Sequence, residues 1–80
     1  MYIVYIIQSQ KTRRYYIGHT NNFSRRLRQH NSGKNISTKS GIPWRLVYQE
    51  KVSNKEGAWL REHKIKSYKG GVAFKKLVNG

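Results

Sequence analysis

The chain has 80 residues, of which 36% are hydrophobic, 17 are lysine or arginine and three are acidic, so its formal net charge is +14. This length predicts one domain over residues 1–80, and the hydrophobic content is too high for a disordered basic tail. The lack of cysteine excludes disulfide scaffolds, thiolate zinc sites and cysteine nucleophiles, and the charge favours nucleic acid or an anionic membrane surface as a partner.

Two strands open the chain. Residues 2–7 are β-branched and aromatic on both faces, which is typical of a central strand covered on both sides. The polar and basic residues 8–14 predict a hairpin loop, and residues 15–18 predict a second strand. The two strands are therefore expected to pair antiparallel.

A basic helix is predicted next. Asn21 and Asn22 offer N-cap side chains to a helix that begins near Phe23, and Gly33 is placed to end it. Phe23 and Leu27 lie one turn apart and would provide the apolar contact of this helix.

The second half of the chain predicts a third strand and further helices. Residues 33–43 contain glycine, serine and proline and predict a loop, and residues 44–48 predict the strand. Residues 53–56 match a capping box and open a helix that is expected to reach about Lys69. A short helix is expected within residues 72–78. Together the elements predict an α/β fold of the α+β type, with a small three-stranded antiparallel sheet flanked by helices.

One of the three acidic residues stands on an apolar helix face. At about 100° per residue, Ala58, Glu62 and Ile65 fall on the stripe that is expected to pack on the sheet. An unpaired buried carboxylate is costly, so an arginine, hydrogen bonds or a metal ion should compensate Glu62. A salt bridge to an arginine and a functional carboxylate are both open at this point.

Four further side chains allow two interpretations each. Arg26 and His30 are spaced i, i+4 and share a helix face. That face is either solvated and merely basic, or it clamps a phosphate beside a histidine that handles a proton near neutral pH. Tyr5 and Tyr16 lie on adjacent strands, either as core residues with solvated hydroxyls or as members of a site. The spacing of the three histidines matches no zinc pattern.

In their order and spacing, these residues resemble the GIY-YIG nuclease domain. The first motif is Ile3-Val4-Tyr5, and the second is Tyr16-Ile17-Gly18. A helix with the sequence FSRRLRQH follows at residues 23–30, and the later helix carries its glutamate in LREHKIK at residues 60–66. The resemblance spans residues 2–68 and is greatest to the small stand-alone bacterial type.

The chain departs from the family pattern at several points. Ile3 stands where the family name has glycine, and His19 stands where other members often have serine or lysine. Asn79 is the candidate for an asparagine that some members place near the C-terminus. The DNA-targeting domain that homing and repair members attach has no counterpart, so low sequence specificity is expected.

The resemblance implies metal-dependent hydrolysis of a phosphodiester bond in DNA. It implies that Tyr5 and Tyr16 line the site as a general base or as groups that orient the attacking water, and that Arg26 stabilises the developing charge. It implies that His30 transfers or relays a proton, and that Glu62 holds one divalent cation, Mg²⁺ or Mn²⁺.

The expected partner is DNA, bound through its phosphate backbone by basic side chains around the site. These side chains are Arg13, Arg14, Arg25, Arg28, Lys34, Lys64, Lys66 and Lys69. The endonuclease would be directed by DNA structure, as in DNA repair or processing, and a protein partner could add specificity. The alternative function is a non-catalytic nucleic-acid-binding module.

A cytoplasmic protein without membrane association is expected. No apolar stretch approaches the roughly 18 residues of a membrane span, and no targeting segment is visible. No obligate oligomer is predicted.

Overall fold

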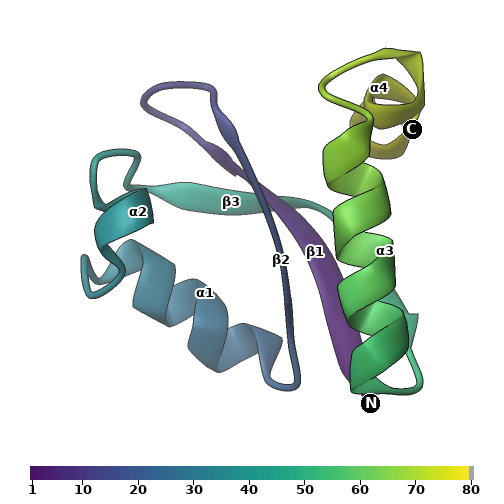
Figure 1. Cartoon of the computed structure of the whole chain (residues 1–80). Coiled ribbons are helices and arrows are strands. Elements are labelled where there is room, and N and C mark those ends of the chain that lie inside the picture. Colours follow the sequence, from purple (N-terminus) through teal and green to yellow (C-terminus); the bar gives the residue numbers. More distant parts are fainter. Residues whose placement is uncertain (80) are drawn as a thin grey trace.

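The computed structural model describes residues 1–79 (Figure 1). In chain order its elements are β1 (Tyr2–Ser9), β2 (Tyr15–Thr20), α1 (Phe23–Asn31), α2 (Ile36–Lys39), β3 (Trp44–Val52), α3 (Lys55–Ser67) and α4 (Val72–Asn79). None of the helices within residues 1–79 is long and apolar enough to cross a membrane.

The three strands form one antiparallel sheet in the order β2-β1-β3. β1 is therefore central, as its apolar residues on both faces predicted. The register places Tyr5 opposite Gly18 and Ile7 opposite Tyr16, so both tyrosines project from the same face of the sheet. β3 is longer than the predicted residues 44–48, because pairing along the whole of β1 extends it to Val52.

Each face of the sheet has its own apolar core. One cluster consists of Val4, Ile6, Ala58, Ile65 and Phe74. The other consists of Tyr5, Ile7 and Trp44, with Phe23 and Leu27 of α1 packed against it. Figure 1 shows the resulting layers, with α1 and α2 on one side of the strands and α3 and α4 on the other. The predicted three-stranded antiparallel sheet flanked by helices is confirmed.

The region of α1 and α2 differs from the prediction in one respect. The Asn22 side chain caps α1 by accepting a hydrogen bond from the Arg25 amide at 3.1 Å, and Gly33 follows the helix with a φ of +82°, as predicted. The prediction of a plain loop over residues 33–43 is wrong, because α2 lies within it. Asn35 caps α2 and stabilises this single turn, accepting from the amide of Ser37 at 3.1 Å.

α3 is capped differently from the prediction. Asn54, and not Ser53, is the N-cap, and its side-chain oxygen accepts from the Gly57 amide at 2.7 Å. The capping box is wrong because asparagine, which caps at least as well as serine, stands one residue later. α3 ends at Ser67, earlier than expected, and α4 follows with Phe74 buried against the sheet.

Candidate active site

The Tyr5 hydroxyl lies at the centre of a buried polar cluster under α1. Tyr5 is 1% exposed, and its Oη is 3.0 Å from His30 Nε2. Burial raises the pKa of Tyr5 to about 12, although the neighbouring Arg26 acts in the opposite direction. Tyr5 is therefore a protonated phenol at neutral pH, and its hydroxyl is hydrogen-bonded inside the protein rather than solvated.

His30 is fully buried and connects Tyr5 to α2. Its Nδ1 is 2.9 Å from Thr38 Oγ1, and the Thr38 hydroxyl donates to the carbonyl oxygen of Asn35 at 3.4 Å. Because a hydroxyl has one hydrogen, Thr38 accepts from Nδ1–H, which leaves Nε2 to accept from the Tyr5 hydroxyl. Burial first, and the charge of Arg26 second, lower the pKa of His30 to about 4. The imidazole is thus neutral at pH 7, and a solvated basic face is wrong for His30.

Arg26 and Tyr16 complete the cluster. Arg26 is half-buried, and its Nη1 donates to Gln29 Oε1 at 3.2 Å. Interaction with the Tyr5 hydroxyl, and more weakly with Tyr16, raises the pKa of Arg26 and keeps the guanidinium charged. The Tyr16 ring centroid lies 6.4 Å from that of Tyr5 and 4.8 Å from that of His30. The two tyrosines therefore meet across the strand pair, with one cation beside both.

Gly18 allows the Tyr5 phenol to occupy this position. A Cβ atom on Gly18 would lie 2.7 Å from Tyr5 Oη and 3.2 Å from Tyr16 Cε1. Both contacts are closer than ordinary van der Waals packing permits, so any side chain here would push Tyr5 away from His30. The second motif needs a glycine at position 18 because the Tyr5 phenol lies so close to the backbone there.

Glu62 lies on the α3 side of the sheet, against the edge strand β2. It is 7% exposed, with Oε1 2.6 Å from His19 Nδ1 and Oε2 2.7 Å from Lys66 Nζ. Burial alone would raise the pKa of Glu62, but the contacts with Lys66 and His19 outweigh burial and lower it. The predicted burial is confirmed, and the partners of the carboxylate are a lysine and a histidine. The alternative of a salt bridge to an arginine is wrong, because the adjacent Arg61 pairs with Glu50 of β3.

The predicted catalytic residues thus occupy two neighbouring places. Tyr5, Tyr16, Arg26 and His30 form one cluster on the α1 side, and Glu62 lies across the sheet from them. The two places are still coupled, because the Glu62 charge contributes to the raised pKa of Tyr5.

The carboxylate of Glu62 fits a divalent cation as a single hard ligand. It is ionised, and Lys66, whose side chain is 49% exposed, can move away from Oε2. Within residues 1–79 no group of three or more His, Asp or Glu side chains gathers around it. Water and a substrate phosphate would therefore have to supply the remaining oxygen ligands, as is usual for Mg²⁺.

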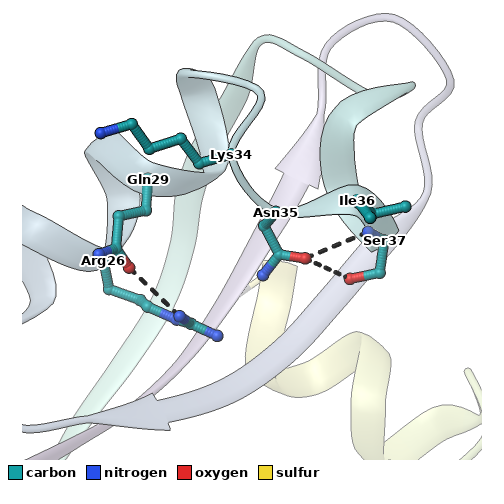
Figure 2. A pocket seen from close by; sticks show the side chains of 6 residues that line it. All are labelled: Arg26, Gln29, Lys34, Asn35, Ile36 and Ser37. Carbon is teal, nitrogen blue, oxygen red and sulfur yellow. Dashed lines mark hydrogen bonds between the residues drawn. The ribbon is translucent and has the colours of Figure 1, made fainter.

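Basic side chains line pockets beside the Tyr5 cluster. A pocket of about 420 Å³ between α1 and α2 is lined by Arg26, Gln29, Lys34, Asn35, Ile36 and Ser37. Figure 2 shows Arg26 extending across this pocket toward Asn35, whose side chain is tied to Ser37. A pocket of about 590 Å³ with Tyr16, Arg14 and Ser37 in its wall lies next to it, since Ser37 lines both.

The other basic residues of the predicted DNA-binding set lie at several places. Arg25, Arg28 and Lys34 share a pocket of about 290 Å³ on α1, and Arg13 lines a separate pocket at the hairpin. Lys64 and Lys69 are exposed near the end of α3, whereas Lys66 contacts Glu62. The candidate Asn79 lies on α4, where it lines a pocket with Val72, Lys75 and Lys76.

Sequence reasoning missed the residues that hold the site in place. Thr38, which fixes the His30 tautomer, also accepts from Trp44 Nε1 through its carbonyl at 2.7 Å. Asn31 pairs with the backbone of Trp44 in both directions, at 2.6 and 3.1 Å. His19 appeared only as a departure from the family pattern, and its position just after the second motif was the one available signal.

Comparison with known proteins agrees with this geometry. A family profile described as the GIY-YIG catalytic domain matches residues 1–74. The chain is 42% identical over 66 residues to a UPF0213 protein of Staphylococcus haemolyticus, which covers 81% of this chain and 79% of the relative. It is 46% identical over 66 residues to one from Syntrophus aciditrophicus, covering 79% and 74%.

A third relative matches a shorter part of the chain. A UPF0213 protein of Haloquadratum walsbyi is 41% identical over 54 residues, covering 66% of this chain and 61% of the relative. No solved structure matches the chain significantly. The profile match over most of the sequence, with the two motifs facing each other around Gly18, shows that the chain belongs to the GIY-YIG family of nucleases.

Proposed function

We propose that the protein is a divalent-metal-dependent DNA endonuclease of low sequence specificity, directed by DNA structure in repair or processing. The proposal rests on the buried hydrogen-bonded chain from Tyr5 through His30 to Thr38, with the charged Arg26 beside it. Burying polar groups costs stability unless each is paired, and a module that only binds nucleic acid does not need such a chain to contact phosphate. This observation favours catalysis over the non-catalytic alternative.

Tyr5 and His30 would move the proton. As water attacks phosphorus and the bond from phosphorus to the leaving deoxyribose oxygen breaks, Tyr5 Oη takes a proton from the water while its own proton passes to His30 Nε2. Because the pKa of His30 is about 4, His30 would return this proton through Tyr5 to the solvent once the product has left. The resting pair is neutral, so no charge has to be buried before substrate binds.

Arg26 and Tyr16 would act on the phosphate. Negative charge gathers on the phosphate oxygens in the transition state, and Arg26 stabilises that charge from a fixed position beside the two tyrosines. Tyr16, on the neighbouring strand, orients the attacking water against the same phosphate.

Glu62 would hold the divalent cation, Mg²⁺ or Mn²⁺, from the other side of β2. When bound, such a cation supplies Lewis acidity and offsets the charge of the phosphodiester. His19 would keep the carboxylate in place through Oε1, and Lys66 would release Oε2. Because β2 is an edge strand, a DNA backbone that crosses this edge would meet Tyr16 on one face of the sheet and Glu62 on the other.

A plasmid-nicking assay tests the proposal directly. Supercoiled plasmid should be nicked with Mg²⁺ or Mn²⁺ and left intact with EDTA. Arg26→Ala should slow nicking by about 10²–10³-fold, as expected for a group that stabilises transition-state charge. Arg28→Ala, which removes the same charge from the same helix, should weaken binding only slightly and leave nicking at saturating protein unchanged. Equal losses of nicking for Arg26→Ala and Arg28→Ala would show that α1 contributes only a basic surface.

Glu62→Gln tests the metal ligand separately. This variant keeps the volume of the side chain but removes its charge, so nicking should be lost with either cation while DNA binding is kept. Its thermal melt in EDTA should change little, because a glutamine keeps a carbonyl oxygen that His19 Nδ1 can contact and the ion pair with the half-exposed Lys66 stabilises weakly. Unchanged nicking by Glu62→Gln would overturn the assignment. Salt-dependent DNA binding by a wild-type protein that never nicks would establish the binding module instead.

A further inference from the structure

α3 carries an exposed pair of stacked aromatic rings that no role described so far uses. Trp59 is 50% exposed, and its ring centroid lies 3.8 Å from that of the exposed His63, with 27° between the ring planes. His63 Nδ1 donates to the carbonyl oxygen of Trp59 at 2.8 Å, so the imidazole is tied to the helix backbone. The two rings are therefore ordered before any ligand arrives.

We propose that Trp59 and His63 form a stacking platform for an unpaired nucleobase of the bound DNA. This inference rests on the proposed function and narrows its substrate class to DNA with unpaired bases close to the cleaved bond. Inside a duplex both faces of a base are covered by its neighbours, so only an unpaired base presents a free face to a protein ring.

The position of the platform on α3 supports this role. Trp59 precedes Glu62 by three residues, a rise of about 4.5 Å along the helix axis. Lys55 and Lys66 flank Trp59 on the same side of the helix, at spacings of four and seven residues. A strand whose phosphate reaches Glu62 would thus have cations for its backbone and an aromatic ring for the adjacent base.

The surroundings of the rings favour a base over an apolar protein partner. The next exposed apolar residue of α3 is Leu60, which is 57% exposed but lies about 100° around the helix from Trp59. Along α3 the aromatic pair therefore lies beside Lys55 and Lys66 and not in a row of exposed apolar side chains. Flat rings amid positive charge are the usual arrangement for binding single strands.

The test compares two 12-residue oligonucleotides of equal charge, oligo-dT and an abasic chain that keeps only sugars and phosphates. Binding to the full chain is measured by fluorescence anisotropy in EDTA, so that no turnover occurs. Wild-type protein should bind oligo-dT about tenfold more tightly than the abasic chain, which corresponds to stacking of a single base. Trp59→Leu should bind both oligonucleotides equally, with the affinity that the wild type has for the abasic chain.

Two further variants act as controls. Trp59→Phe keeps an aromatic face and should keep most of the preference for oligo-dT. Leu60→Ala removes exposed apolar surface from the same helix and should keep all of it. Both Trp59 and Leu60 are exposed, so circular dichroism should show folded protein for every variant.

Equal wild-type affinity for the two oligonucleotides, or a preference that survives in Trp59→Leu, would overturn the platform. Failure of the proposed function has a different signature, which is a wild-type protein that does not nick plasmid with any divalent cation. A protein that nicks plasmid but binds oligo-dT and the abasic chain equally would therefore refute only the platform.

Discussion

The two faces of β1 carry different kinds of residues. The face toward α3 and α4 has an apolar core of Val4, Ile6, Ala58, Ile65 and Phe74. The face toward α1 and α2 buries hydroxyl and imidazole groups, those of Tyr5, Ser9, His30 and Thr38. Within residues 1–79, every buried polar side-chain atom has a hydrogen-bond partner.

With Glu62 as the exception, the groups proposed for catalysis and the larger apolar core lie on different faces of the sheet. Side chains alternate between the two faces of a strand, so neighbours such as Tyr5 and Ile6 serve different cores. A buried polar network tolerates little change because each lost partner leaves another group unpaired. Substitutions on the α1 side should therefore impair catalysis first, and substitutions on the α3 core should impair stability first.

The largest effect is expected for Tyr5→Phe. Loss of the hydroxyl removes the proposed proton path, so nicking should fall by about 10²–10⁴-fold. The unfolding free energy should fall by only about 1–3 kcal/mol, because His30 Nε2 loses its donor while the ring remains. Single-turnover nicking and urea unfolding measure the two quantities. Nicking within tenfold of wild type would show that the hydroxyl is structural.

The opposite pattern is expected for Ile65→Ala on the other face. Ile65 is fully buried, so the substitution should reduce the unfolding free energy by about 2–5 kcal/mol. At a temperature where the variant is folded, its nicking rate should equal that of wild type. Leu60→Ala, on the exposed side of the same helix, should change stability by less than about 0.5 kcal/mol. A specific loss of nicking by folded Ile65→Ala would contradict the separation.

Above about pH 5 the pH dependence of stability should report chiefly on the α1 side, because Glu62 on the α3 side titrates below its ordinary pKa value of 4.5. The pKa of His30 is lowered from 6.5 to about 4 in the folded protein. As pH falls through this window the unfolded chain takes up a proton that the folded chain refuses, so stability decreases, by up to about 3 kcal/mol. Urea unfolding between pH 7 and 4.5 should show a weaker decrease for His30→Gln than for wild type. His63→Ala, at an exposed histidine, is the control and should keep the wild-type slope.

A smaller loss of nicking than for Tyr5→Phe is expected for Gly18→Ala. The added Cβ would press on the Tyr5 hydroxyl, so the phenol should shift and overpacking should cost about 1–3 kcal/mol. Nicking should fall while DNA binding stays. The control is Gly70→Ala, where φ is +77° and nothing lies within 4 Å of the added Cβ. Gly70→Ala should lower the unfolding free energy by about 1 kcal/mol through backbone strain and leave nicking intact. Equal nicking by the two variants would show that Tyr5 tolerates displacement.

Much of the fold could be predicted because it depends on local patterns. The apolar residues of β1 on both faces indicated a central strand, and Asn22 and Gly33 marked the limits of α1. The errors were local as well. α2 was read as a loop because one helical turn carries little periodic signal, and the cap of α3 is Asn54 rather than Ser53. In both places an asparagine side chain determined the structure.

The sequence by itself determined the types and order of the candidate site residues, and it placed Glu62 on a buried stripe next to Ala58 and Ile65. Tyr5, Tyr16, Arg26 and His30 could be named as site residues because they match the motifs of the family that the chain resembles, whereas spacing alone showed only that Arg26 and His30 share a helix face.

Only the tertiary structure decided which groups those residues meet. His19 reaches Glu62 across 43 positions of sequence, and Tyr5 reaches His30 across 25. Such contacts depend on how β2 pairs within the sheet and on how α1 and α3 pack against it. No local sequence pattern encodes this packing. The protonation of each group follows from that packing, because burial and neighbouring charge act through space and not along the chain.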